Sequence, residues 1–377
     1  DVVQQLVKAK AGIAQLAVEE QEVTILFTDI ENFTKICESM GVGNKLLALM
    51  SDYFTAMTEI ITSTGGCLLE FVGDAVLAVW NAPNPEELHA VRAVTAALEM
   101  HAYLEGMVKE WDEKGYPRIR IRCGIHTAKV LVGNLGAPNR MKYGVLGDGV
   151  NTASRLEETN KRYGTRTLIS ANTFKEVNRQ INNIRNLHHN DVGEIKGSNP
   201  KGFFQTRAVD RVILKGKTKA TTLYEVVDFM GDKEDTRKSS QLRGLSGSFD
   251  GVMLSTTALK LSGEAKVLIS TEESPSPKNK VFTLSGFKEL MLESYNSGWT
   301  SFLARDFKRA FQLFQLVNQM QLEIGPKTQV SGEPNDFGDT FQGDKAAILL
   351  RDRCDRFLKE PPPSNWDGTE ILTDKHF

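Results

Sequence analysis

The stretch between Val23 and Thr34 constrains the fold of this chain more than any other. The apolar run Val23–Leu26 leads to the acidic residue Asp29, after which the pattern changes to that of a helix. Short apolar and β-branched runs are typical of buried strands, so we expect a strand that ends at Asp29. Unpaired amides at a helix N-terminus bind phosphate oxygens, and an adjacent carboxylate can hold a divalent cation against the same phosphates. The plainer interpretation is that Asp29 only caps the helix.

A second element is predicted between Gly65 and Trp80, where two apolar runs flank a short turn. The turn contains Gly73, which lets the backbone approach closely, and Asp74, which we place at the tip of a β-hairpin. Two carboxylates at the ends of adjacent strands can share a pair of metal ions. Such a pair serves in-line phosphoryl displacement, with one ion at the attacking oxygen and the other at the leaving group.

A third element is the glycine-rich segment Tyr143–Glu157, which leads into a predicted helix. Asn151 and Arg155 are four residues apart, and this spacing places them on one face of that helix. A guanidinium on this face can neutralise charge that grows on a phosphoryl group. In isolation, a surface salt bridge explains Arg155 equally well.

Composition excludes several classes of function. The net charge of −2 over 377 residues gives no reason to expect binding to nucleic acid or to an anionic membrane. The four cysteines are far apart and form no CxxC pair, which indicates a reducing compartment and neither a disulfide framework nor a zinc site. No apolar run reaches transmembrane length, and we expect a cytoplasmic location. Because the sequence starts at Asp1 and not at Met, we expect a fragment, which leaves room for a sensor or membrane segment upstream.

Taken together and in this order, the three elements closely resemble the catalytic domain of class III nucleotidyl cyclases. The resemblance runs from about Glu22 to Val227, and it includes three further short motifs: Gly124-Ile125-His126-Thr127, Arg140-Met141-Lys142-Tyr143 and Leu214-Lys215-Gly216-Lys217. It implies an α+β fold, a ferredoxin-like βαββαβ-type cyclase sandwich. The implied reaction is attack of a nucleoside triphosphate's 3′-hydroxyl on its own α-phosphorus, which gives a 3′,5′-cyclic nucleotide and pyrophosphate.

The resemblance also implies roles for individual residues. Asp29, Ile30 and Asp74 match metal-binding positions, which implies two divalent cations, Mg²⁺ or Mn²⁺. Asn151 matches the asparagine that orients the ribose, and Arg155 matches the arginine that offsets charge on the α-phosphoryl group. The implied nucleotide-binding positions are Ile30, Glu31, Asn32, Phe33, Thr34, Glu70, Gly144 and Lys215. Because the family's site lies between two catalytic domains, the resemblance implies a homodimer.

Glu70 indicates the nucleobase. Guanine presents N1–H and N2–H₂ donors that a carboxylate accepts, whereas adenine presents an acceptor at N1. In the resembled family this position carries glutamate in guanylate cyclases and lysine in many adenylate cyclases, so we expect GTP to be preferred. Gly144, which offers no side chain to the base, and Lys142, where animal guanylate cyclases carry arginine, depart from that pattern. Two alternatives stay open: an adenylate cyclase that uses ATP, and a catalytically inactive cyclase-homology module with a regulatory or scaffold role.

Four segments are predicted along the chain. Residues 1–21 are expected to end a signalling helix or to be a frayed terminus, and residues 22–230 to form the cyclase domain. Residues 231–284 are rich in Ser, Gly, Lys and Glu, which predicts a partly disordered linker. Residues 285–377 predict a helical extension with a hairpin similar to a tetratricopeptide unit. Within the cyclase domain, the connection 181–210 is longer than is usual in the family, and it predicts either a projecting arm or a surface loop.

Overall fold

The computed structural model describes residues 18–41, 43–137, 140–190, 204–229, 254–261, 264–271, 280–324 and 343–372. The chain divides into two compact units. The first comprises residues 1–229 together with 370–377, and the second comprises residues 230–369. Within the described residues, no helix combines the length and the apolar character needed to cross a bilayer.

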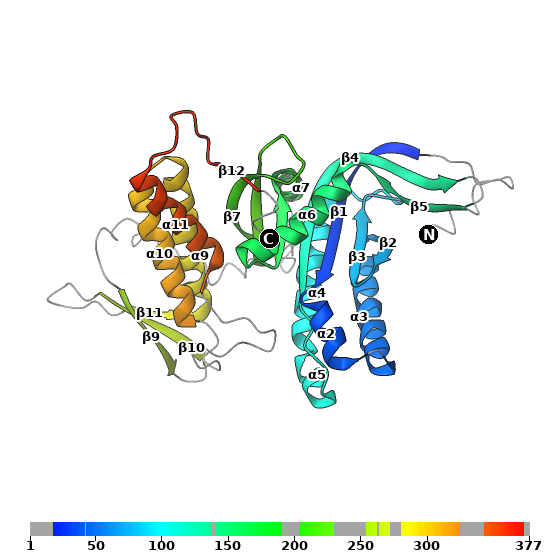
Figure 1. Cartoon of the computed structure of the whole chain (residues 1–377), viewed down its shortest axis with the longest axis horizontal. Helices are drawn as coiled ribbons and strands as arrows, with labels where there is room; N and C mark the ends of the chain where they lie inside the picture. Colours follow the sequence, from blue (N-terminus) through cyan, green and yellow to red (C-terminus); the bar gives the residue numbers. More distant parts are fainter. Residues whose placement is uncertain are drawn as a thin grey trace. The chain divides into compact units, whose positions relative to one another are not determined.

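The first unit is built on a mixed sheet (Figure 1). Its strands are β1 (Val18–Ile30), β2 (Cys67–Val72), β3 (Ala75–Trp80), β4 (Ile121–Ala137), β5 (Arg140–Leu146), β6 (Thr167–Ser170), β7 (Phe204–Ile213) and β8 (Thr221–Phe229). Its helices are α2 (Phe33–Met40), α3 (Asn44–Ser63), α4 (His89–Gly106), α5 (Val108–Lys114), α6 (Asp148–Tyr163) and α7 (Ala171–Asn190). A further strand, β12 (Thr369–Ile371), lies at the edge of this sheet beside β7.

The strand order confirms the predicted ferredoxin-like arrangement. Strands β4, β1, β3 and β2 are neighbours in that order, and each adjacent pair is antiparallel. The crossovers are α3 between β1 and β2, and α4 between β3 and β4. On the other side of β4 the sheet continues through β6, which is parallel to β4, and then through β8 and β7.

Both faces of the sheet are buried, because apolar side chains alternate along β1. Leu26 and Ile30 point into the larger core, to which α3, α4 and α7 contribute. Val23 and Ile25 point to the opposite face, into a smaller core with Ala153 of α6. Side chains of a strand alternate between the two faces, so Asp29 lies on the same face as α6.

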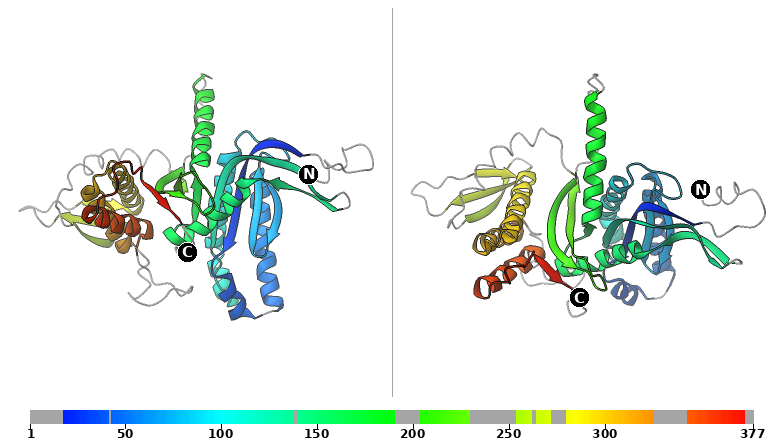
Figure 2. Two further views of the ribbon diagram at one scale, coloured as in Figure 1. Left: turned by 45° about the horizontal axis from the view of Figure 1, so that its top comes forward. Right: turned by 90° about the horizontal axis from the view of Figure 1, so that it is seen from above.

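Two predicted segments of the first unit differ from the structure. Residues 18–21, expected at the end of a helix, form the start of β1, where they pair with β4; residues 1–17 lie outside the described residues. Helix α7 continues to Asn190 as a long helix (Figure 2), so it covers the first part of the connection 181–210 that the sequence predicted as an arm or a loop. The predicted arm or loop therefore begins as helix and ends as the start of β7, and residues 191–203 between them fall outside the described residues.

The second unit contains a small sheet as well as helices. Strands β9 (Leu254–Leu261), β10 (Glu264–Thr271) and β11 (Lys280–Thr283) form an antiparallel sheet where the sequence predicted a linker. Leu259 and Leu261 alternate with Lys260, which suits a strand, but the polar composition around β9 concealed this pattern. Helices α9 (Leu284–Leu303), α10 (Phe307–Ile324) and α11 (Lys345–Lys359) follow.

Aromatic packing holds the helices of the second unit together. The ring centroid of Phe302 lies 5.9 Å from that of Phe307 and 5.2 Å from that of Trp366. The ring of Phe357 packs against the ring of Trp366 in the same cluster. Asp344 caps α11 by accepting a hydrogen bond of 2.9 Å from the amide of Ala347. The predicted helical extension is therefore present, while its likeness to a tetratricopeptide unit stays a prediction.

Candidate functional site

The two predicted metal-binding carboxylates lie together at the ends of paired strands. Asp74 is in the two-residue turn between β2 and β3, next to Gly73, whose φ of 67° favours glycine. An Asp74 carboxylate oxygen accepts a hydrogen bond of 3.2 Å from the amide of Ile30, at the end of β1. Burial, and then repulsion by Asp74, raises the pKa of Asp29 to about 6. A carboxyl group whose ionisation a neighbouring carboxyl group opposes favours a divalent cation between the two, so these residues fit the implied metal.

A buried arginine joins this pair. Arg122 lies opposite Asp29 in the β1–β4 register, and its Nη2 is 3.0 Å from Asp29 Oδ2. Its Nε donates to Glu157 Oε1 of α6 at 2.8 Å, while its Nη1 is 4.0 Å from Glu31 Oε1. The guanidinium side chain is only 7% exposed. Burial raises the pKa of Glu157 to about 7, against the opposing effect of Arg122.

Sequence reasoning missed Arg122 and Glu157 as site residues. Arginine alternates with isoleucine from Arg118 to Arg122, and nothing in this alternation distinguishes Arg122 from Arg118 and Arg120. Only the pairing of β4 with β1 brings it to Asp29. The sequence offered one signal for Arg122, namely that it lies two residues before the Gly124–Thr127 motif.

The predicted phosphate-binding segment adopts the expected strand-to-helix turn. β1 ends at Ile30, and α2 begins at Phe33. The residue before the helix is Asn32, in the left-handed conformation with φ of 55°, and its side chain makes no capping hydrogen bond. Asp29 therefore does not cap α2, so the plainer interpretation of Asp29 is wrong. The amides of the first helical turn, which include Phe33 and Thr34, point away from the helix with no partner in it.

The predicted base-contacting residues lie on β2 and β5. A β-bulge between Leu68 and Glu70 interrupts the β2–β3 register just before Glu70, and bulges redirect the side chain that follows. Glu70 is 46% exposed and accepts a hydrogen bond of 2.6 Å from Lys142 Nζ of β5. Lys142 and Gly144 are two residues apart on β5 and share one face of it. A Cβ built on Gly144 would meet Leu135 at 3.5 Å, an ordinary contact distance, so the position has space for a side chain.

Helix α6 carries the predicted catalytic residues and crosses β4 at very close range. A Cβ on Gly124 would lie 2.1 Å from the carbonyl oxygen of Ala153, so only glycine permits this crossing. Asn160 fixes the same contact by donating to the carbonyl of Cys123 at 3.0 Å. The crossing leaves Asn151 exposed at the start of the helix.

Arg155 lies against the turn that follows β7. A Cβ on Gly216 would come within 3.1 Å of Arg155 Nη1, which places the guanidinium beside the predicted phosphate-binding Lys215. Among the described residues, Arg155 Nη1 is buried without a hydrogen-bond partner. Such a donor is costly to leave unpaired, and an anionic oxygen would satisfy it. The neighbouring Lys217 forms an ion pair with Asp148, the first residue of α6.

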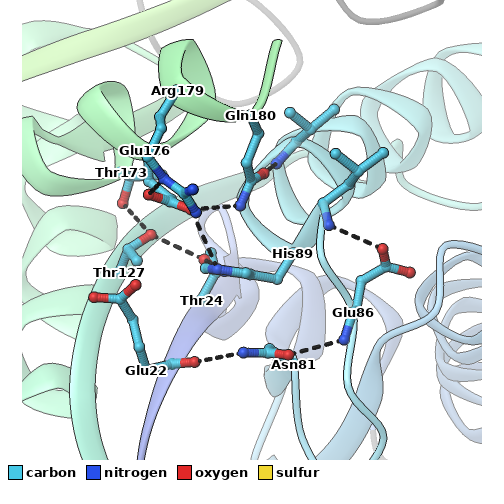
Figure 3. A network of polar contacts seen from close by, with 12 residues as sticks. Glu22, Thr24, Asn81, Glu86, His89, Thr127, Thr173, Glu176, Arg179 and Gln180 are labelled. Atoms are coloured by element: carbon cyan, nitrogen blue, oxygen red, sulfur yellow. Dashed lines mark hydrogen bonds and ion pairs between the residues drawn. The ribbon is translucent and has the colours of Figure 1, made fainter. Parts of the chain in front are cut away.

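A separate polar network lies where α4 and α7 pack on β1 (Figure 3). His89 Nδ1 is 2.7 Å from Thr24 Oγ1, and its Nε2 is 3.5 Å from Glu176 Oε1. Atoms of Glu22, His89 and Glu176 that could bind a metal all lie within 4.8 Å of one another. Glu176 already accepts hydrogen bonds from Arg179 and from a nearby glutamine, and burial lowers the pKa of His89. We interpret this network as packing between elements, distinct from the Asp29–Asp74 pair.

Comparison with known proteins identifies the first unit. The adenylate cyclase 1 of Rhizobium meliloti (strain 1021) is 35% identical over 207 residues, which cover 55% of this chain and 28% of that protein. The terminal-differentiation-specific adenylate cyclase of Dictyostelium discoideum is 34% identical over 218 residues, 58% of this chain and 9% of that protein. The crystal structure of the adenylyl cyclase CyaB from P. aeruginosa is 28% identical and covers 58% of this chain and 99% of its own, with a TM-score of 0.46.

The chain thus spans less than a third of the length of these two sequence relatives. A family model described as the adenylate and guanylate cyclase catalytic domain matches residues 16–224, which is more than half of the chain. The matched region contains Asp29, Asp74, Asn151 and Arg155. The chain therefore belongs to the adenylate and guanylate cyclase catalytic-domain family.

Proposed function

We propose that this chain is a homodimeric class III cyclase that converts a nucleoside triphosphate, with GTP preferred, to its 3′,5′-cyclic nucleotide. The observation that carries the proposal is the Asp29–Asp74 pair, in which two carboxyl groups meet at the strand ends and the pKa of Asp29 is raised by burial and then by Asp74. Bound there, two Mg²⁺ or Mn²⁺ ions would activate the 3′-hydroxyl and screen the charge of the leaving group. The bond from O3′ to the α-phosphorus forms as the α–β bridging bond breaks, pyrophosphate leaves, and the hydroxyl proton passes to water.

The side chains of the proposed site divide into two groups within one chain. Asp29 and Asp74 contact residues of β1 and β4, whereas Arg155 packs against the turn at Gly216. The unpaired Nη1 of Arg155 would donate to an α-phosphoryl oxygen, and Asn151 would orient the ribose. Two copies of the chain would join the two groups into complete sites, as the family resemblance implies. This division supports the homodimer.

The preference for GTP rests on Glu70. Its carboxylate is exposed and can accept hydrogen bonds from N1–H and N2–H₂ of guanine, while Lys142 would donate to O6. Each hydrogen bond to a charged group contributes on the order of 1.5–3 kcal/mol. This corresponds to roughly tenfold to a hundredfold discrimination between bases. Gly144 adds no side-chain contact, so we place the selectivity at the lower end.

The Glu70–Lys142 pair also favours a second candidate, an adenylate cyclase. The 2.6 Å contact places an ammonium donor beside a carboxylate acceptor. Adenine presents an acceptor at N1 and donors at N6, so the same pair could read adenine with Lys142 at N1 and Glu70 at N6. The two curated relatives described above carry the name adenylate cyclase.

Turnover of GTP and ATP by the full chain, each with Mn²⁺ and with Mg²⁺, tests both candidates. We expect a higher kcat/KM for GTP, and a loss of most turnover in Asp74→Ala without loss of fold. Faster conversion of ATP would assign the adenylate cyclase. No turnover of either nucleotide would leave the catalytically inactive module as the better description.

A further inference from the structure

Arg122 is held from two sides by carboxylates that belong to different elements. Its Nε donates to Glu157 at 2.8 Å and its Nη2 to Asp29 at 3.0 Å. The Glu157 side chain is 8% exposed, the Arg122 side chain 7% and the Asp29 side chain 30%. The network therefore runs from the interior, at Glu157, outward to the more accessible Asp29. Asp29 is one of the residues proposed above to bind metal.

Glu157 shares its helix with the other half of the proposed site. It lies two residues after Arg155 on α6, and the backbone of α6 at Glu157 crosses β4 directly at Gly124. Because only glycine fits at this crossing, α6 has little freedom to shift relative to β4. The Glu157 carboxylate is consequently fixed relative to the strand that carries Arg122.

We propose that Glu157 is a positioning residue that, through Arg122, sets the affinity of the Asp29 carboxylate for a divalent cation. The inference rests on the proposed metal-binding role of Asp29. A guanidinium and a divalent cation compete for the same carboxylate. Glu157 neutralises part of the charge on Arg122 and fixes its Nε, so it weakens the hold of Arg122 on Asp29. Without the Glu157 charge, Arg122 competes more strongly for Asp29, and the cation binds less tightly.

The test is Mn²⁺ binding to the full chain at pH 8, where the Glu157 carboxyl group is ionised, measured by electron paramagnetic resonance without nucleotide. Specific binding is defined as the Mn²⁺ binding that the Asp74→Asn variant loses. Glu157→Gln keeps the shape of the side chain and an acceptor oxygen, and it removes the charge. We expect it to raise the Mn²⁺ Kd about three- to tenfold, the size of one close charge–charge interaction that is largely screened by water. Glu158→Gln is the matched control, because Glu158 is exposed on the same helix, and we expect no change.

A double-mutant cycle separates positioning from direct charge effects. If Glu157 acts through Arg122, the Glu157→Gln effect disappears when Arg122 is already replaced by Gln. An equal effect in both backgrounds would show that Glu157 acts directly by its charge, and it would overturn the positioning role. Urea unfolding of each variant shows that the protein measured is folded. If Glu157 has only a structural role, Glu157→Gln changes the urea unfolding curve and leaves the Mn²⁺ Kd unchanged.

The outcomes for the inference and for the proposed function are distinguishable. If the wild type turns over neither nucleotide but Glu157→Gln weakens Mn²⁺ binding through Arg122, the proposed activity fails and the inference stands. If the wild type is active and Glu157→Gln binds Mn²⁺ as tightly as the wild type, only the inference fails. Absence of any binding that depends on Asp74 would overturn both.

Discussion

Asp29 and Asp74 place two carboxyl groups side by side at the ends of β1 and the β2–β3 turn. In the absence of a cation, burial and then repulsion by Asp74 raise the pKa of Asp29 from 3.8 to about 6. A raised carboxyl pKa means that the folded protein binds the proton more tightly than the unfolded chain does. The stability associated with the protonated Asp29 is therefore present below about pH 4 and is lost as the pH rises through about 6.

Asp29→Asn should accordingly stabilise the protein in the presence of a chelator at pH 7.5. We expect a gain on the order of 1 kcal/mol after screening by solvent, or ~2–4 °C in Tm, because the amide carries no charge that burial desolvates or that repels Asp74. The same variant should show no catalytic turnover. Thermal unfolding at pH 7.5 and at pH 4 provides the measurement. The gain should vanish at pH 4, and an equal gain at both values would mean that repulsion is not its cause.

The base preference is a second property of single residues. Glu70→Lys should lose GTP turnover and gain some ATP turnover, because an ammonium donates to adenine N1 but repels the guanine donors. Adding Gly144→Asp should increase the gain, since a Cβ at Gly144 meets only an ordinary contact with Leu135 and the carboxylate would accept from the adenine amino group. The measurement is kcat/KM for both nucleotides in the three proteins. A wild type that already prefers ATP would contradict the assigned role of Glu70.

At the scale of elements, the crossing of α6 over β4 positions Asn151, Arg155 and Glu157 together. Gly124→Ala should destabilise the first unit by about 1–3 kcal/mol or more, because a Cβ would lie 2.1 Å from a backbone oxygen of α6. Urea unfolding checks this value. Gly106→Ala in α4 is the control, since its Cβ meets nothing within 4 Å, and we expect it to be neutral or slightly stabilising. Equal stabilities of the two variants would show that α6 can move away from the sheet.

The elements nearest the proposed site could be predicted from the sequence, while several others could not. The strand that ends at Asp29, the hairpin turn at Asp74 and the helix with Arg155 each have a local signature of apolar runs and glycines. The role of Arg122 depends on pairing between strands distant in sequence, which no local pattern contains. The sheet of β9, β10 and β11 was missed because its short apolar runs, such as Val267-Leu268-Ile269, lie within a polar segment.

At the scale of the whole molecule, the proposed homodimer predicts complementation between two inactive variants. Asp29→Ala removes a metal-binding carboxylate, and Arg155→Ala removes the phosphoryl-binding guanidinium. Each alone should be inactive, but a mixed dimer contains one site with both intact groups. We expect the mixture to recover up to about a quarter of wild-type activity if subunits exchange at random. Cyclic nucleotide formation is measured after mixing and re-equilibration, and full activity of a strictly monomeric wild type in sedimentation would contradict the homodimer.

The edge strand β12 has a consequence for how the second unit is connected. The chain leaves the first unit after Phe229 and rejoins it at Glu370, where Leu372 donates to the carbonyl of Ile213 at 3.1 Å. The second unit is thus an insertion in the fold of the first and not an appendage to it. A stop codon after Phe229 would remove β12, the outer neighbour of β7, along with the insertion, and would leave that edge of β7 unpaired and open to association with other chains. An internal deletion that keeps residues 370–372 would remove the second unit and preserve that edge.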